Sequence, residues 1–412
     1  MRTIKDYIQH VKGHIRNKEA HDSVEKELTY HLAKSKQAWQ ENGYNETDAE
    51  QQAVLEMGNA TNLGISLNQI HQPKIDWLLV IPFLLAAMCS FLPLLPAELS
   101  LRDFIMRNIV IVIAGIAVAM FLMRFDFRKL EHYSTHMYIL ACLLFLIVLN
   151  GNEAIYGVIF FKAGPLEIQG WMTLPLFLIS FAGLFAKQKK SLWSLLILYA
   201  IGAYCYMRLP DIHIFCTYTA IVATLFYASN FSRKQKLTIT VAFSLLFIAF
   251  IGYLMLAPLK PYQLTRLQTI YTPGLEDNPT VLFISSVMKQ LAWFGTSNQP
   301  FAGGAHTDFV LLTILQSYGI IAGVIVLCIL GFIIYRIAHT LGFIHNEYGR
   351  LLMIGGLAFL TTQIVYQVFM LFGLVPVMSM PIPFISYGLF PMLLGSVAIG
   401  LTLSIYRRKL YI

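Results

Sequence analysis

Residues 309–335 read FVLLTILQSYGIIAGVIVLCILGFIIY and contain no charged side chain. About 20 consecutive apolar residues are enough to carry a helix across the hydrocarbon core of a bilayer. This run therefore predicts a membrane-spanning helix. The composition of the whole chain also indicates a membrane protein. Of its 412 residues, 57% are hydrophobic and only 13% are charged, whereas a soluble globular domain has about 25% charged residues.

Similar runs recur on both sides of this stretch. Most approach the length that a membrane span requires, and those at 108–123, 134–150, 171–186 and 191–207 are near the lower limit. The sequence predicts an all-α polytopic membrane protein of about ten transmembrane helices, with both termini on one side. The predicted spans are 76–95, 108–123, 134–150, 171–186, 191–207, 212–229, 236–257, 309–335, 351–374 and 383–406.

The formal net charge of +8 does not indicate a nucleic-acid partner. The basic residues lie in short clusters between apolar runs, as is typical of cytoplasmic membrane loops. One set of alternate loops and the C-terminal tail carries most of them, which predicts two cytoplasmic termini and an extracytoplasmic loop at 258–308. Loops of that length are often functional. The basic positions of the cytoplasmic set are Arg124, Arg128, Lys129, Lys187, Lys189, Lys190, Arg233, Lys234, Lys236, Arg336, Arg350, Arg407, Arg408 and Lys409.

Residues 1–72 differ from the rest because they are polar and contain no run long enough to cross a membrane. Apolar residues at helical spacing predict a helix from Asp22 to Asn42. The stretch Thr47–Glu50 predicts a capping box at the start of the next helix, and a last helix is expected over 62–70. We interpret this segment as a cytosolic module of three or four short helices, followed by a membrane domain at 73–412.

The order of motifs in the module is similar to that of the permease-prefix (HAAS) helical domain. The matching stretches are Glu27–Leu32, Gly43–Ala49 and Met57–Asn59. A generic helical tail is the alternative. The module predicts a cytosolic contact, either self-association or an unidentified regulator.

The loop at 258–308 holds the residues best suited to chemistry: Arg266, His306 and Asp308. Asp308 lies at the membrane edge, just before the apolar run. An ionised carboxylate near hydrocarbon is costly and is by default a functional hypothesis. The same residue, or Thr307, can instead cap the following helix.

Two stretches resemble the SEDS family of membrane glycosyltransferases, the RodA and FtsW type. The first has Tyr-Gln, Arg, Pro and Thr-Asp-Phe in the family's order, and the second resembles its Pro-Phe-x-Ser-Tyr-Gly motif before the last span. Gln363 and a weaker Pro210-Asp211 also match. The matching positions are Tyr262, Gln263, Arg266, Pro273, Thr307, Asp308, Phe309 and 376–388.

Several family motifs are altered in this chain. The Gln-Pro-Ser-Glu-x-x-Lys motif of the fourth span is replaced by Gln169-Gly170-Trp171-Met172, with Pro175 where the Lys is expected. Leu389 follows Gly388 in place of a second Gly. The resemblance therefore indicates a divergent member.

The resemblance implies a peptidoglycan glycosyltransferase of the bacterial cytoplasmic membrane that polymerises lipid II during cell-wall synthesis for shape, division or sporulation. Asp308 would be the general base or would hold a divalent cation, Mg²⁺ or Mn²⁺, against the pyrophosphate. Arg266 suits phosphate oxygens because its guanidinium donates in a planar fork.

The resemblance also implies further substrate contacts, from Asp211, His306, Gln363, Ser386 and Tyr387. Asp211 can instead be a helix cap and His306 a turn residue. A penicillin-binding transpeptidase is the implied partner. Two other functions stay open: a non-catalytic regulator or scaffold, which the altered motifs favour, and a lipid II flippase.

Overall fold

The computed structural model describes residues 3–95, 101–151, 153–155, 158–163, 166–187, 191–209, 212–256, 279–295, 306–378 and 380–409. The chain forms two compact units. The smaller contains Met1–Asp76 and Ile405–Ile412, and the larger contains Trp77–Ser404.

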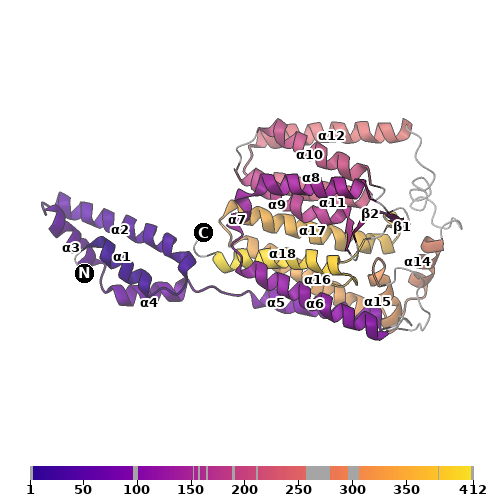
Figure 1. The fold of residues 1–412 in the computed structure, drawn as a ribbon, viewed down its shortest axis with the longest axis horizontal. Helices are drawn as coiled ribbons and strands as arrows, with labels where there is room; N and C mark the ends of the chain where they lie inside the picture. Colours follow the sequence, from indigo (N-terminus) through magenta and orange to yellow (C-terminus); the bar gives the residue numbers. More distant parts are fainter. Residues whose placement is uncertain are drawn as a thin grey trace. The chain divides into compact units, whose positions relative to one another are not determined.

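The smaller unit is built from short helices, which Figure 1 shows in indigo and violet. Their bounds are α1 (Ile4–Gly13), the 3₁₀ turn η1 (Lys18–Ala20), α2 (His21–Glu41), α3 (Glu46–Glu56) and α4 (Ala60–Ile70). Gly43 and Gly58, with φ of 89° and 81°, follow α2 and α3. A positive φ suits glycine, which has no Cβ to clash.

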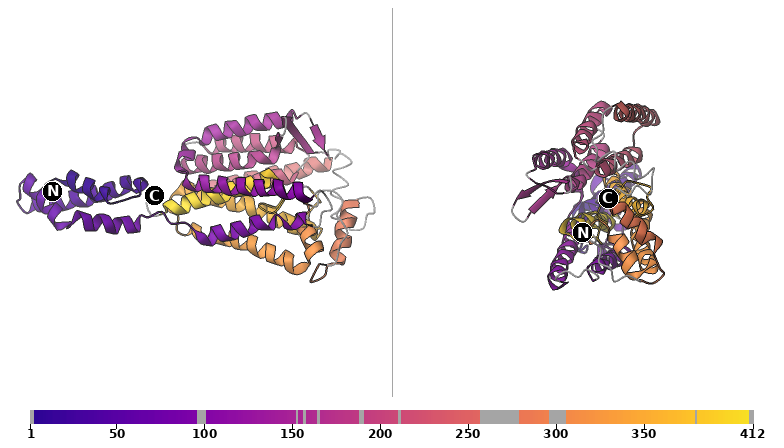
Figure 2. Two further views of the ribbon diagram at one scale, coloured as in Figure 1. Left: turned by 60° about the horizontal axis from the view of Figure 1, so that its bottom comes forward. Right: turned by 90° about the vertical axis from the view of Figure 1, so that its right-hand side faces the viewer.

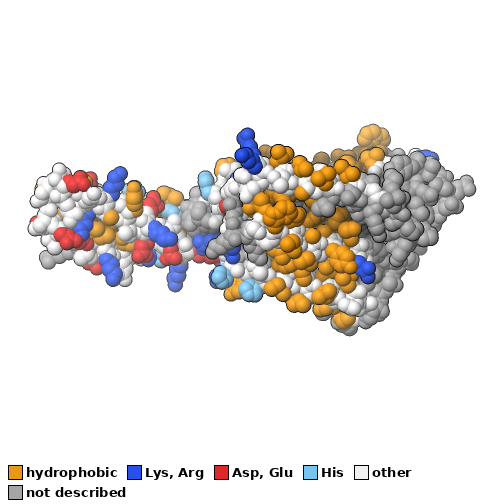
Figure 3. Space-filling model, turned by 90° about the horizontal axis from the view of Figure 1, so that it is seen from above, with side chains coloured by type: hydrophobic (Ala, Val, Ile, Leu, Met, Phe, Trp, Pro, Cys, Tyr) orange, Lys and Arg blue, Asp and Glu red, His pale blue; other side chains and the backbone are white. Residues whose placement is uncertain are grey.

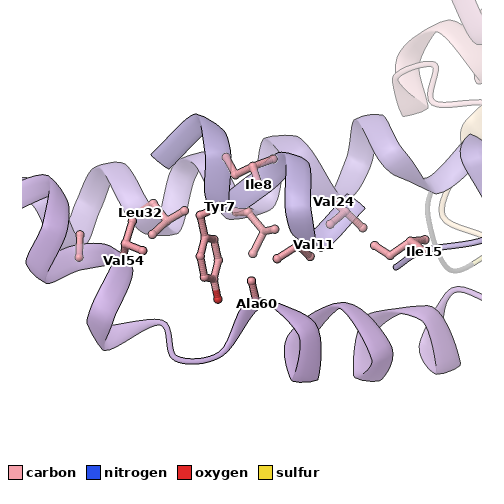
Figure 4. Packing of buried hydrophobic residues seen from close by; sticks show 10 residues of the cluster. Tyr7, Ile8, Val11, Ile15, Val24, Leu32, Val54 and Ala60 are labelled. Carbon is pink, nitrogen blue, oxygen red and sulfur yellow. The ribbon is translucent and has the colours of Figure 1, made fainter. Parts of the chain in front are cut away.

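Apolar side chains from all four helices form the core of this unit (Figure 4). Tyr7 and Val11 of α1 are 1% and 0% exposed and face Leu32 of α2 and Ala60 of α4. The spacing of these residues along α1 and α2 follows the period of one helix face. Burial of that face holds the helices together.

The predicted capping box at Thr47 is wrong, because α3 begins earlier. Asn45 is the N-cap, and its side chain accepts the backbone N–H of Asp48 at 2.8 Å. Glu50 therefore does not take part in a capping box. Its Oε1 instead accepts a hydrogen bond from the backbone N–H of Ile4 at 2.8 Å. The carboxylate satisfies a donor at the start of α1, where such groups have no partner within the helix.

The larger unit is a bundle of long helices that run alongside one another in two views (Figures 1 and 2). Each of the ten predicted spans overlaps at least one helix, although the bounds differ at several of them. The elements are α5 (Trp77–Cys89), η2 (Leu92–Leu94), α6 (Leu101–Arg124), α7 (Arg128–His132), α8 (Ser134–Leu149), η3 (Gly170–Thr173), α9 (Leu174–Lys187), α10 (Leu192–Met207), α11 (Ile212–Ala228), α12 (Arg233–Leu256), α14 (Pro279–Lys289), α15 (Val310–Tyr318), α16 (Ile320–Leu341), α17 (Glu347–Leu371) and α18 (Leu389–Arg408).

Six of the described segments are long and apolar enough to cross a membrane: Trp77–Leu94, Arg102–Arg124, Gly170–Lys187, Ile320–Leu341, Glu347–Leu371 and Leu389–Arg408. Hydrophobic side chains spread over the helices of this unit in Figure 3. Such an apolar surface is unusual for a soluble monomer and is what a lipid-facing bundle requires. The all-α polytopic prediction is confirmed, and the protein is a multi-pass membrane protein.

The apolar run 309–335 is not one helix. It breaks at Gly319, whose φ of 87° and ψ of 176° end α15 and begin α16. A Cβ on Gly319 would lie 2.5 Å from the carbonyl oxygen of Trp293. The backbone N–H of Ile320 donates to Ala292 at 3.0 Å, so the segment after α14 supplies an acceptor at the start of α16. Such close approach requires glycine.

A three-stranded antiparallel sheet follows α8, which the spans did not predict. Its strands are β1 (Glu153–Ile155), β2 (Val158–Ala163) and β3 (Leu166–Gln169). In its register Phe160 of β2 pairs with both Glu153 and Gln169. The strands lie at the same end of the bundle as α14, and α7 lies at the opposite end (Figures 1 and 2).

Candidate functional site

Two segments far apart in the sequence meet in the larger unit. One is the turn at 306–309 that precedes α15. The other, which we call the motif loop, is formed by residues 376–378 and 380–388 before α18. The backbone N–H of Tyr387 donates to the carbonyl of His306 at 2.8 Å, and the Ser386 hydroxyl donates to the carbonyl of Thr307 at 2.6 Å. The motif loop therefore contacts the turn directly.

A third contact comes from Gln367 on α17. Its side-chain Nε2 donates to the backbone carbonyl of Asp308 at 2.6 Å. The same nitrogen donates to the carbonyl of Met380 in the motif loop. Three successive carbonyls, from His306 to Asp308, thus accept hydrogen bonds from the motif loop and α17.

The motif loop is itself fixed at several points. Ser386 Oγ accepts the backbone N–H of Ile382 at 2.8 Å, and the Tyr366 hydroxyl donates to the carbonyl of Pro376 at 2.9 Å. Phe384 has a φ of 71° and is 1% exposed. Its ring packs edge-on against Phe83 of α5, with centroids 5.4 Å apart. A positive φ in a bulky residue is strained and persists only where the surroundings determine it.

An aromatic group covers one side of the turn. Phe104 of α6 lies 5.6 Å from the His306 ring and 5.4 Å from the Tyr387 ring, measured between centroids. The His306 and Tyr387 rings are also 5.4 Å apart. Burial in this environment lowers the pKa of His306 below 6.5, and the nearby Asp308 carboxylate acts in the opposite direction. The imidazole is therefore mainly neutral at pH 7.

Asp308 is partly exposed in the turn. The N-cap of α15 is Phe309, and α15 begins at Val310. Asp308 therefore precedes the cap position, so the helix-cap alternative from the sequence does not match the observed start of α15. Asp308 is therefore a partly accessible residue, and the backbone around it is held by hydrogen bonds from the motif loop and from α17.

The structure brings four of the predicted site residues together: His306, Asp308, Ser386 and Tyr387. Gln363 is 7% exposed on α17, one turn before Gln367. Two other predictions lie outside the described residues: Asp211 and Arg266.

Sequence reasoning missed Gln367. The signal that could have found it is a second glutamine on an apolar helix, since polar side chains within a span face the bundle interior and often mark functional sites.

The described residues contain no group of three or more His, Cys, Asp or Glu side chains that could hold a metal ion. A site made only of protein ligands is therefore not found in this part of the chain. Mg²⁺ is often held by one or two carboxylates together with substrate phosphates. The single carboxylate of Asp308 fits that arrangement.

Comparisons with known proteins identify the family and the fold. The sequence model of the FtsW/RodA/SpoVE family, described as cell cycle proteins, matches residues 75–411. A probable peptidoglycan glycosyltransferase FtsW of Nitrosomonas europaea is 23% identical over 376 residues, which cover 82% of this chain and 94% of the relative. The corresponding Bacillus subtilis protein is 25% identical over 332 residues, which cover 74% and 82%.

Solved structures share the fold. A chain from a peptidoglycan synthase complex, described as coordinating polymerization and crosslinking, has a TM-score of 0.68 at 22% identity, over 81% of this chain and 98% of its own. The crystal structure of Thermus thermophilus RodA, a rod shape determining protein, has a TM-score of 0.59 at 20% identity, over 81% and 97%. The residues that the family model matches, 75–411, contain the membrane bundle and leave out α1 to α4.

Proposed function

Since this chain belongs to the FtsW/RodA/SpoVE family, we propose that it is a peptidoglycan glycosyltransferase that polymerises lipid II into glycan strands for the bacterial cell wall. Relatives whose matches cover most of the chain are named probable peptidoglycan glycosyltransferases. The family match spans 75–411, so it includes both the turn at 306–309 and the motif loop.

One observation carries the proposal: the Thr307-Asp308-Phe309 turn is joined to the motif loop by hydrogen bonds from Ser386 and Tyr387. These are the two stretches in which the sequence most resembles the family. Their contact places a partly exposed carboxylate on an anchored backbone. A carboxylate carried by an anchored backbone is suited to act on a substrate that is bound beside it.

In the reaction, the 4-hydroxyl of one sugar chain attacks the anomeric carbon of a lipid-linked donor. The bond from that carbon to the pyrophosphate breaks, and the hydroxyl loses its proton. Asp308 is the proposed acceptor of this proton, a role that contributes about 10²–10⁴ in rate. Arg266 would bind the departing pyrophosphate, because its guanidinium pairs with phosphate oxygens in two parallel hydrogen bonds.

A divalent cation is compatible with this arrangement. Asp308 would hold Mg²⁺ or Mn²⁺, and the cation would supply positive charge to the departing pyrophosphate. Neutral His306 adds no positive charge beside the carboxylate, so the carboxylate would keep its affinity for a cation.

The proposal also includes the orientation of the protein in the membrane and its partners. The distribution of Lys and Arg supports cytoplasmic termini and an extracytoplasmic site. A penicillin-binding transpeptidase is the proposed partner for crosslinking, supported by the likeness to a chain of a peptidoglycan synthase complex. The helices of residues 1–72 would contact a cytosolic partner.

The test is glycan polymerisation from purified lipid II in detergent with Mg²⁺ or Mn²⁺, with and without the transpeptidase. We expect glycan strands from the wild-type protein. An active family relative assayed in parallel is the positive control. If the relative makes product and the folded protein makes none under either condition, the polymerase function is refuted and the regulatory alternative is favoured. Movement of lipid II between leaflets without product would favour the flippase.

A further inference from the structure

We propose that Gln367 is a positioning residue, whose amide bridges Asp308 and Met380 and thereby sets the orientation of the Asp308 carboxylate. This inference rests on the proposed function for its catalytic consequence. Its structural part, that the bridge holds the turn, can be tested without any activity.

Both hydrogens of the Gln367 amide are donated to backbone carbonyls. A glutamine NH₂ group has two hydrogens to donate, and Nε2 of Gln367 donates to two carbonyls, those of Asp308 and Met380. One belongs to the turn and one to the motif loop. The side chain therefore fixes the spacing between two segments that are separated by about 70 positions in the sequence, at a low dielectric where such bonds are strong.

An amide at this buried position costs free energy. Gln367 is 0% exposed, and its Oε1 has no hydrogen-bond partner within the described part of the chain. A buried acceptor without a partner costs about 1–3 kcal/mol. An apolar side chain of the same size would avoid that cost and fill the same space. The amide is therefore better explained by its donors than by packing.

The hydrogen bond from Gln367 also restrains the residue that carries the proposed catalytic group. The bridged carbonyl belongs to the same residue as the proposed catalytic carboxylate. Rotation of the Asp308 backbone would move that carboxylate, and a misplacement of about 1 Å can reduce the rate about 10²-fold. The Ser386 and Tyr387 bonds fix the two preceding carbonyls, and Gln367 holds the carbonyl of Asp308 itself.

The first test measures hydrogen exchange by mass spectrometry on the full-length protein in detergent. Gln367→Met removes both donors and keeps a similar shape. We expect faster exchange in peptides that contain 306–310 and 380–388. Thr362→Val is the matched control, because among the described residues the Thr362 hydroxyl has one hydrogen bond, which it donates to Ala358 in the same helix at 2.7 Å. Unchanged exchange in Gln367→Met would overturn the bridge.

The second test measures glycan polymerisation. We expect Gln367→Met to lower kcat about 10²-fold, with the KM for lipid II within about twofold of wild type and the control unchanged. A folded variant with faster exchange and an unchanged kcat would overturn the positioning role. The positioning role would also be overturned if the fall in kcat were fully explained by a smaller fraction of folded protein. An inactive wild type would refute the proposed function, and hydrogen exchange would still decide the bridge.

Discussion

Ser386→Ala should destabilise the larger unit, because this hydroxyl makes two hydrogen bonds at a buried position. Ser386 is 2% exposed, donates to the Thr307 carbonyl and accepts from the backbone N–H of Ile382. Ile382 is 0% exposed, so loss of its acceptor leaves a buried donor without that partner, at a cost of about 1–3 kcal/mol. Loss of the bond to Thr307 adds about 0.5–1.5 kcal/mol. We therefore expect a total loss of about 1.5–4.5 kcal/mol.

Ser396→Ala is the matched control. Ser396 is 0% exposed on α18, and its hydroxyl has no hydrogen-bond partner among the residues that the structure describes. Its removal should leave stability unchanged or slightly raised, because no hydrogen bond is lost. The assay is the apparent thermal midpoint of each purified variant in one detergent. Equal midpoints for Ser386→Ala and Ser396→Ala would refute the reasoning.

Two further perturbations follow from the structure. Gly319→Ala should lower the free energy of unfolding by at least about 2 kcal/mol, because the backbone conformation of Gly319 is close to glycine-only and the added Cβ would lie 2.5 Å from a backbone oxygen. The control in the same thermal assay is Gly331→Ala in α16, which has nothing within 4 Å of the added Cβ and should be neutral or stabilising. An equal loss of stability in both variants would contradict this account. The pKa of His306 is lower in the folded protein than in the unfolded chain. As the pH falls, the unfolded chain therefore binds the proton first, and the free energy of unfolding should decline below about pH 6.5. His306→Gln should therefore show a smaller fall in thermal midpoint than wild type between about pH 7.5 and 5.5, and equal falls would show that His306 is not responsible.

The sequence predicted the positions of the helices well because hydrophobic length is a local property. It failed at Gly319, where an uninterrupted apolar run conceals a break. The break depends on the approach of 292–294, a contact that no local pattern indicates. The sheet at 153–169 was missed because its strands are short, and short apolar stretches do not distinguish strand from helix.

The candidate site was predicted in part. His306, Asp308, Ser386 and Tyr387 were identified from two separate motifs, and their contact in space became visible only in the fold. On α17 the sequence pointed to Gln363, whereas Gln367 makes the hydrogen bonds to the turn. One helical turn separates the two, and only the position of the neighbouring backbone distinguishes their roles.

The most direct test of the account is the kcat of lipid II polymerisation by wild type and Asp308→Asn, with lipid II binding measured for both. Asparagine keeps the size of the side chain and removes its basicity. We predict binding within about threefold of wild type and a kcat lowered about 10²–10⁴-fold. A kcat within tenfold of wild type would contradict the central claim that the Asp308 carboxylate carries out the chemical step.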